Sequence, residues 1–412
     1  MDNKKMKTSG LSLPIKILIA LVVGAIVGFV VGEKIVVIKP LGDIFLRLLR
    51  MTIVPLVFCS IITGISGISD LARLRKVGVT FIKFWLLSSA LAAISGIVMA
   101  SILKPGVGIV LPNTGEIANA DINMVDTLVG WIPENAFNAL SSGNMIQVII
   151  FAVFVGISIV LIIDTNAGQT MYKFFEAANE LMQKMVSIVL KVAPIGVFAL
   201  MANVTGTVGG IALLGIGKML ITQYLAYVLV IISYGFLLKF ILGLNPIQHF
   251  VNVFPAMVLA FTTQSSSGTI PVTMEVTKNR SGVPEDIVNV ITAPAATINM
   301  QACSAEMPIY AIFAAQIYGL QYEPLQFIQI IILGIVMAAG VGGVPGGGIM
   351  MSAVMLEIMG LPLDIVPWIA GVYLLIDMPN TMLNVTGDTV GMVYTAEKLG
   401  ELDKDIYNSS KR

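Results

Sequence analysis

Five polar residues near the C-terminus follow the spacing of one helical face. At about 100° per residue, positions 0, +3, +4, +7 and +11 lie on the same side of a helix. Apolar residues 365–376 precede this stripe, and a charge in apolar surroundings is costly, so the stripe must face a partner or a cavity. A surface helix with a solvated face is the alternative. The stripe consists of Asp377, Asn380, Thr381, Asn384 and Asp388.

The acids of this stripe have no basic partner nearby in the sequence. Residues 281–397 contain nine Asp or Glu and no Lys or Arg. External cations are therefore the natural counter-ions of Asp377 and Asp388, namely a substrate ammonium and a hard metal ion such as Na⁺. Backbone carbonyls near Asn299 and Gly340 could add oxygen ligands. Protonation of the carboxyls is the competing answer.

Two long uncharged stretches, residues 240–274 and 324–356, are interrupted by helix-breaking residues. The first contains T-T-Q-S-S-S-G-T-I-P and the second contains G-V-G-G-V-P-G-G-G. An unpaired backbone group costs several kcal/mol in lipid, so such backbone must be buried in protein or line a wet cavity. We therefore predict two re-entrant helical hairpins. A pair of kinked ordinary helices is the alternative.

Each predicted hairpin is followed by an apolar segment with polar residues inside it, at 298–306 and 377–388. A hairpin and a broken helix, repeated twice, place substrate and ion sites near the bilayer midplane in secondary transporters. The successive N–H groups of S-S-S and G-G-G, with helix N-termini, bind carboxylates without a basic side chain. An anion nest beside an acidic stripe fits a zwitterion, which indicates a free amino acid.

The composition indicates an integral membrane protein. Of 412 residues, 57% are hydrophobic and only 12% are charged, against roughly 25% charged in soluble domains. The mean hydropathy is +0.92. Lys plus Arg equals Asp plus Glu at 24 each, which argues against a nucleic-acid binder. The two cysteines, Cys59 and Cys303, imply no disulfide framework.

Uncharged runs approach the roughly 20 residues that a spanning helix needs. The first run follows three lysines, as in a signal peptide, but no small-residue cleavage site follows, so we predict a retained helix. These lysines and the basic cluster at 73–76 lie two spans apart, so the positive-inside rule predicts a cytoplasmic N-terminus. The runs are residues 17–32, 51–69, 84–103, 135–163, 192–217 and 219–238.

Six short motifs are distributed along the chain: R-L-L-R-M-T-I-V-P-L-V-F, A-P-I-G-V-F-A-L, S-S-S-G-T-I-P-V-T-M, A-T-I-N-M, G-V-P-G-G-G and N-V-T-G-D. Together they resemble the dicarboxylate/amino acid:cation symporter family, which includes the glutamate transporters. The resemblance implies an all-α integral membrane fold of eight transmembrane helices and two re-entrant hairpins. It also implies a homotrimer in the plasma membrane, in which a mobile transport domain moves like an elevator against a static scaffold.

The resemblance divides the chain into five segments. Residues 1–77 would form scaffold helices 1 and 2, and 78–104 a third helix in the transport domain. Residues 105–239 would hold scaffold helices 4 and 5 and the sixth helix. Residues 240–398 would be the transport core, with hairpin 1, helix 7, hairpin 2 and helix 8, and 399–412 a cytoplasmic tail.

The resemblance also implies substrate contacts. Asp377 would hold the α-amino group, and Asn384 and the backbone at Ser266 the α-carboxylate. The carbonyls of Gln264 and Val344 would face the ammonium. The full substrate set is Gln264, Ser265, Ser266, Cys303, Val344, Gly348, Asp377, Asn380, Thr381 and Asn384.

Two sodium sites are implied in the same way. The first would use Asn299, Asn384, Asp388 and the Ala295 carbonyl. The second, which closes with the tip of the second hairpin, would use Thr297, Met300, Ala338, Ala339 and Val341.

Departures from the family pattern bear on the substrate. Asn380 and Gln264 stand where acidic amino acid transporters or their relatives place an arginine, and Cys303 replaces a threonine. A buried second carboxylate would lack its charge partner, costing several kcal/mol. We therefore predict a neutral amino acid, small or polar. The presence of Asp377 argues against a plain dicarboxylate, although a proton-coupled amino acid or dicarboxylate symporter remains the alternative.

A third family ion site is altered. Gln301 stands where the family has an aspartate and Trp85 where it has a tyrosine, whereas Ser88 and Ser89 keep their hydroxyls. We expect this site to be weakened or lost. Glu306 lies one residue from a proton-binding glutamate of some relatives, so it is either a proton carrier or a structural or water-facing carboxyl. His249 is expected at the membrane interface.

Two other function classes are disfavoured. An intramembrane aspartyl protease needs two aspartates in contact, but Asp377 and Asp388 are 11 residues apart, about 16 Å of rise on a continuous helix. A dedicated channel would not need a zwitterion pocket. The chain is therefore not expected to be an enzyme or to use a catalytic residue.

Overall fold

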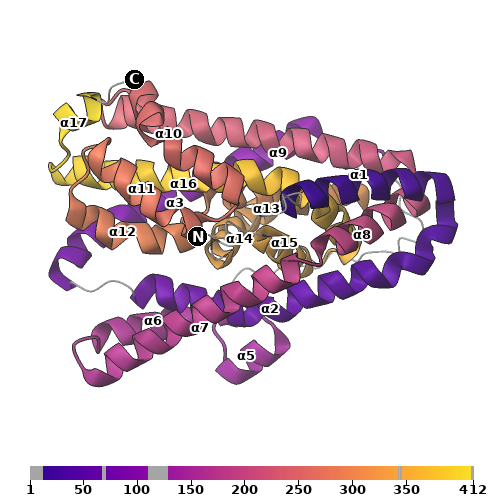
Figure 1. Cartoon of the computed structure of the whole chain (residues 1–412), viewed down its shortest axis with the longest axis horizontal. Coiled ribbons are helices and arrows are strands. Elements are labelled where there is room, and N and C mark those ends of the chain that lie inside the picture. Colours follow the sequence, from indigo (N-terminus) through magenta and orange to yellow (C-terminus); the bar gives the residue numbers. More distant parts are fainter. Residues whose placement is uncertain (1–12, 67–70, 110–128, 342, 344–345, 410–412) are drawn as a thin grey trace, which may run out of the picture.

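The computed structural model describes residues 13–66, 71–109, 129–341, 343 and 346–409, and all regular secondary structure in them is helical (Figure 1). The elements are α1 (Leu13–Val31), η1 (Gly32–Ile38), α2 (Lys39–Ser66), α3 (Leu71–Leu103), α5 (Ala136–Ser142), α6 (Met145–Leu161), α7 (Asn166–Leu190), α8 (Ala193–Val208), α9 (Gly210–Phe236), η2 (Leu237–Ile241), α10 (Pro246–Thr263), α11 (Ser266–Asn279), α12 (Glu285–Ile298), α13 (Gln301–Ile317), α14 (Pro324–Gly340), α15 (Gly347–Ile358), η3 (Leu363–Ile365), α16 (Val366–Leu399) and α17 (Lys404–Ser409).

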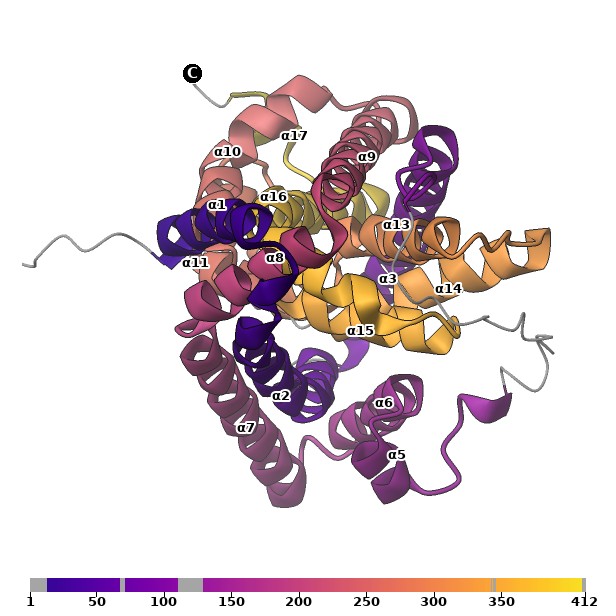
Figure 2. The same cartoon turned by 90° about the vertical axis from the view of Figure 1, so that its right-hand side faces the viewer.

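Helices from the middle of the chain separate from the C-terminal helices in one view of the molecule. Figure 2 shows α2, α5, α6 and α7 on one side, and α10, α11, α13 and α16 on the other. Helix α1 packs along α8, which also contacts α2 and α16. Glycines allow this close packing, because a Cβ added at Gly28 would lie 2.1 Å from the Ala202 carbonyl oxygen.

Helix α16 carries the polar stripe and is largely buried. All five stripe residues are at most 6% exposed, so the alternative of a solvated surface helix is wrong. The helix is continuous despite Pro379, so the expected break within residues 377–388 is also wrong. Proline has no N–H for the Leu375 carbonyl, and the Tyr224 hydroxyl of α9 donates to that oxygen at 2.8 Å. A neighbouring helix therefore supplies the missing hydrogen bond.

Each stretch predicted as a hairpin contains two helices that contact each other. Helix α10 ends at Thr263, Gln264 has a left-handed φ of +55°, and α11 begins at Ser266. The Ser265 hydroxyl caps α11 by accepting from the Gly268 N–H at 3.0 Å. Helices α14 and α15 are separated at residues 341–346. The two helix interruptions therefore lie at the predicted tips.

The predicted break in the segment after the first hairpin is present. Helix α12 ends at Ile298 and α13 begins at Gln301, with Asn299 and Met300 between them in non-helical conformations. At the other end of the first hairpin, α17 of the predicted tail contacts α10, and the Tyr407 hydroxyl donates to the Asn245 carbonyl at 2.9 Å.

Four helical segments of the described residues are long and apolar enough to cross a membrane: 15–66, 76–103, 210–241 and 363–399. Helices α7 and α8, which meet at a 55° bend, form a fifth if they are one span. Helices α6, α14 and α15 are also apolar, but they are shorter than these segments. The count of eight spans stays a prediction.

Two predicted spans have different boundaries in the structure. The run 192–217 does not form one helix, because Gly209 takes φ +78° and α9 starts at the next residue. The run 135–163 is divided at Gly143, with φ +73°, and the Asn144 side chain then caps α6. Glycine tolerates these left-handed conformations, so helices can end within an uncharged run.

Candidate functional site

A cavity of about 430 Å³, here called the central cavity, lies between the tip of α10 and α11, helix α16 and four N-terminal helices. Helices α1, α2, α7 and α8 form one wall, which is mostly apolar. The opposite wall carries the polar residues Thr262, Thr263, Gln264, Ser265, Tyr373 and Asp377, together with Gly346 and the apolar residues Ile349, Ala370 and Leu374. The structure therefore brings three of the predicted substrate residues to one cavity.

Asp377 is the acid of the central cavity. One carboxylate oxygen accepts the Gly346 backbone N–H at 3.1 Å, and the other accepts the Thr381 hydroxyl at 3.4 Å. No described Lys or Arg lies within salt-bridge distance of it, since the ion pairs between described residues are Lys278–Glu285 and Lys404–Glu397. A tip N–H, expected to bind a substrate carboxylate, thus binds Asp377 itself. The carboxylate retains acceptor positions for an ammonium.

The tip of α10 and α11 supplies a donor to the same cavity. The Gln264 side chain is 8% exposed, and its amide nitrogen has no hydrogen-bond partner among the described residues. Ser266 is buried at the first position of α11, and Ser265 is used as the helix cap. The N-terminus of α11 at this tip offers N–H donors across the cavity from the Asp377 carboxylate, which is the combination that a zwitterion requires. Val344 lies outside the described residues.

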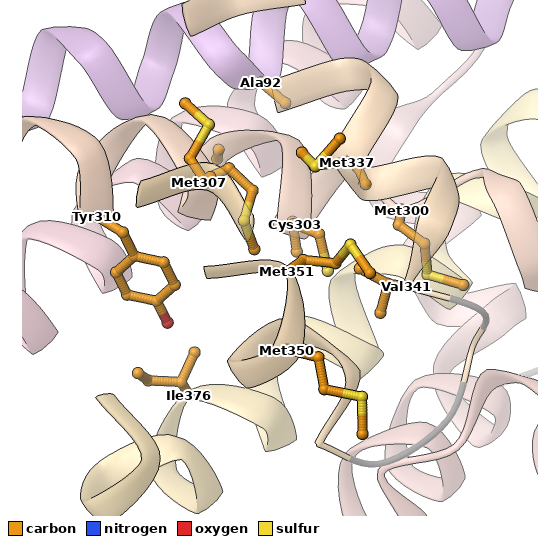
Figure 3. Close-up of a cluster of buried hydrophobic side chains, with 14 of the residues drawn as sticks. Ala92, Met300, Cys303, Met307, Tyr310, Met337, Val341, Met350, Met351 and Ile376 are labelled. Atoms are coloured by element: carbon orange, nitrogen blue, oxygen red, sulfur yellow. The ribbon is translucent and has the colours of Figure 1, made fainter. Parts of the chain in front are cut away.

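Asn380 is the centre of a buried amide and thiol cluster. Its Oδ1 accepts from Asn384 Nδ2 at 2.7 Å and from Cys303 Sγ at 3.4 Å. Asn384 Oδ1 in turn accepts the Ala302 N–H at 2.8 Å and so satisfies a free donor at the start of α13. Figure 3 shows Cys303 among methionine side chains, of which Met351 comes from α15. Asn384 thereby links α16 to α13.

Glu306 contacts the other side of Asn380. It is fully buried, so the alternative of a water-facing carboxyl is wrong. Its carboxylate accepts the Tyr310 hydroxyl at 2.7 Å, the Tyr227 hydroxyl at 3.4 Å and the Asn380 side-chain amide. A Cβ added at Gly348 would lie 2.8 Å from a Glu306 oxygen. The predicted substrate residues Asn380 and Gly348 thus surround a carboxyl.

In the first predicted ion site, Asn299 presents its amide nitrogen, and not its oxygen, to Asp388. Asp388 and Asn299 are buried, and Asn299 Nδ2 donates to Asp388 Oδ1 at 2.7 Å. The Ala295 carbonyl accepts the Asn299 N–H at 2.9 Å. Carboxylate and carbonyl oxygens suit a hard cation. Asn384 is held by Asn380 and Ala302 instead.

The residues of the second predicted ion site lie where the second tip meets the end of α12. A Cβ added at Gly343 would be 2.2 Å from the Ala296 carbonyl and 3.3 Å from the Met300 side chain. Thr297 donates its hydroxyl to the Ala293 carbonyl at 3.2 Å. The other members, Ala338, Ala339 and Val341, are buried at the end of α14.

The third predicted ion site is filled with hydrogen-bond donors. Trp85 donates its indole N–H to the Ile298 carbonyl at 3.0 Å. The Gln301 amide donates to Ser88 Oγ at 3.0 Å and to Asn299 Oδ1. Gln301 Oε1 and the hydroxyls of Ser89 and Tyr234 are buried without a partner among the described residues. The residues of this site include no carboxylate, so a cation there would have only neutral ligands.

Three tyrosines were not found by sequence reasoning about the site. Tyr227 and Tyr234 come from α9, far from the motifs, and carry no local signal. Tyr310 lies four residues after Glu306, a spacing that places both on one helical face. His249, predicted to lie at the membrane interface, is fully buried within the protein, with its Nε2 3.1 Å from the Thr389 hydroxyl.

An apolar helical chain in which helix interruptions and a buried acidic stripe meet at one cavity has the organisation of a membrane transporter. Comparison with known proteins gives the same class. Residues 13–398 match the sodium:dicarboxylate symporter family, and the chain belongs to this family. It is therefore a multi-pass membrane symporter.

The chain is similar to a proton/sodium-glutamate symport protein of Geobacillus stearothermophilus, with 29% identity over 95% of each chain. It is 30% identical to the Bacillus subtilis protein of the same name, over 94% of this chain and 93% of the relative. An L-cystine uptake protein of Bacillus cereus is also 30% identical, over 89% of this chain and 83% of the relative. All three of these relatives are named as transport proteins.

Proposed function

We propose that the protein is a secondary active symporter that takes up a neutral amino acid, small or polar, together with Na⁺. The observation that carries this proposal is the central cavity. It is lined by the Asp377 carboxylate, an acceptor for an ammonium, and by the tip of α10 and α11, where the N-terminus of α11 offers N–H donors to a carboxylate. No described basic side chain pairs with Asp377. The cavity suits one positive and one negative group.

A second carboxylate on the substrate is disfavoured at the inner end of this site. The buried Glu306 carboxyl lies against Asn380 and has no described cation beside it, so an acidic side chain there would add a second carboxyl without a charge partner. This separates the proposal from the substrate in the names of the glutamate symport relatives. The L-cystine uptake relatives are named for an amino acid without net charge.

For the coupling ion, the proposal rests on Asp388 and its neighbours. The Asp388 carboxylate is buried, with the Asn299 side-chain amide as its partner and no described cation. The Ala295 carbonyl accepts the backbone N–H of the same Asn299. A Na⁺ ion would neutralise it with hard oxygen ligands. With Gln301 and Trp85 in place of oxygen ligands, we propose that the third site holds no cation. Proton coupling is the alternative.

The transport movement we propose is an elevator within a homotrimer in the plasma membrane, with the N-terminus cytoplasmic. Residues 78–104 and 240–398 would move with the re-entrant hairpins, against a scaffold from residues 1–77 and 105–239 that includes the sixth helix. The central cavity supports this division, because α1, α2, α7 and α8 line one wall and the mobile segments line the other.

A protease is disfavoured, since Asp377 and Asp388 lie far apart on the continuous α16. A channel needs no such paired donor and acceptor.

The test is uptake into proteoliposomes of a labelled amino acid panel, with an inward Na⁺ gradient, a proton gradient or neither. We expect Na⁺-driven, saturable uptake of a neutral amino acid. Asp377→Asn should abolish it, because the variant loses the charge that holds the ammonium. Asp164→Asn, the same change at an exposed residue, is the matched control and should transport normally.

Two outcomes would contradict the proposal. If aspartate or glutamate were the best substrate, the absence of an arginine at positions 380 and 264 would not exclude acidic substrates. If a proton gradient drove uptake and Na⁺ had no effect, Asp388 would be a proton carrier and not an ion ligand.

A further inference from the structure

A second cavity, here called the lateral pocket, lies among helices α9, α10 and α16 and has a volume of about 370 Å³. Helix α16 contacts both of the other helices, and Figure 2 shows α9 and α10 on either side of it. Met378, Pro379 and Met382 of α16 line the pocket, and α10 adds Phe261. None of the lining residues is charged, and only two tyrosines of α9 are polar. Such a lining suits an apolar ligand.

The hydroxyls of both tyrosines are already paired within the protein. Tyr224 donates to the Leu375 carbonyl at 2.8 Å. Tyr227 donates to a Glu306 oxygen at 3.4 Å and accepts from the Asn380 side-chain nitrogen at 3.3 Å. A buried water needs about two to four polar partners. The lateral pocket offers no free side-chain donor, so water is a poor occupant.

The lateral pocket opens on the hydrocarbon of the bilayer. Helices α9 and α16 lie in the long apolar segments 210–241 and 363–399, and the pocket residues fall near the middle of both. At the opening, Val228 is 49% exposed and Phe261 is 36% exposed. Exposed apolar side chains continue along α9 and α10 away from the pocket, at Ile221 and Phe254. Lipid head groups lie at the ends of spanning segments, so acyl chains are the part of a lipid that reaches this depth.

We propose that the lateral pocket binds one acyl chain of a membrane phospholipid. Its α16 residues cover positions 375–383, a rise of about 12 Å, so the pocket is elongated along the helix. A chain lying in it makes the dispersion contacts that an empty pocket would lose. The chain also packs against Tyr227, so the lipid contacts a side chain that reaches the buried Glu306. This inference goes beyond the proposed function, because it requires a bilayer and no substrate.

The experiment uses the full-length protein in phosphatidylglycerol nanodiscs, in which a small fraction of the lipid carries a diazirine near the end of one acyl chain. Light converts the diazirine into a carbene with loss of N₂, the carbene inserts into neighbouring side chains, and mass spectrometry identifies them. We expect labels on Met378 and Met382. Val228→Trp fills the opening and should lower these labels at least fivefold. Val251→Trp, the same change at an exposed residue of α10 outside the pocket, is the matched control and should leave them unchanged.

A label on the outer surface separates a bound chain from general contact with the bilayer. Ile221, exposed on α9 and outside the pocket, should be labelled equally in the wild type and in every variant. If Val228→Trp does not fold, Val228→Phe narrows the same opening and should lower the α16 labels too. Labels on Ile221 but none on Met378 or Met382 in the wild type, or α16 labels that persist in both Val228 variants, would overturn the inference.

Discussion

At the scale of single residues, one amide determines which atoms Asn299 presents to its neighbours. Gln301 donates to Asn299 Oδ1, so Asn299 Nδ2 faces the Asp388 carboxylate. A neutral chain of hydrogen bonds thus runs from Ser88 through Gln301 and Asn299 to Asp388. Such a chain stabilises the buried Asp388 carboxylate, although less strongly than a bound cation would.

Gln301→Asp tests this neutral arrangement. The change removes both amide donors and adds a second buried carboxylate beside the unpaired Tyr234 hydroxyl, so the site gains the ligands of a cation. We expect the charge moved per substrate to rise by one Na⁺ relative to the wild type, measured by electrophysiology on supported proteoliposome membranes. Gln321→Asp, at an exposed position, is the control. An unchanged charge in active Gln301→Asp protein would contradict the proposed loss of the third site.

At the scale of elements, close contacts between helix backbones position the site. Helix α3, which carries Trp85 and Ser88, packs against α13, which carries Gln301 and Glu306. A Cβ added at Gly96 would lie 2.1 Å from the Ala305 carbonyl oxygen, a backbone atom that cannot move alone. The small residue lets the two helices approach closely.

Gly96→Ala should therefore separate α3 from α13. We expect a loss of about 1–3 kcal/mol of stability, typical of overpacking, and weaker transport, measured by thermal unfolding in detergent and by uptake. Gly217→Ala, where no atom lies within 4 Å of the added Cβ, should be neutral or slightly stabilising. Equal stability of the two variants would show that the contact can relax.

At the scale of the whole molecule, the central cavity lies between two groups of helices. Ser187 of α7 and Thr263 at the end of α10 line its opposite walls. If the transport core moves as a body, the distance between these walls must change, whereas distances within the core must not.

Spin labels at Ser187 and Thr263 test this movement by pulsed electron resonance. We expect the distance distribution to shift by several ångströms when Na⁺ and substrate are added. A label pair at Thr263 and Glu285, both within residues 240–398, should keep its distribution. A shift in the second pair, or none in the first, would contradict the elevator movement.

The sequence by itself determined the features that are local in the chain. The spacing of the α16 stripe reports one helical face, because helical periodicity depends only on neighbouring residues. The S-S-S and G-G-G segments locate the helix interruptions, since these residues disfavour helix interiors wherever they lie. The absence of Lys and Arg from residues 281–397 likewise leaves the buried Asp377 without a basic partner close in sequence.

Only the tertiary structure decided which groups satisfy the buried polar atoms. Tyr224 supports α16 across Pro379, Tyr227 reaches Glu306 and Gly346 binds Asp377, although each pair is far apart in sequence. The expected break in α16 is absent, and the Tyr224 hydroxyl supplies the donor that Pro379 lacks. Hydrogen-bond partners depend on which surfaces pack together, and no local pattern encodes that.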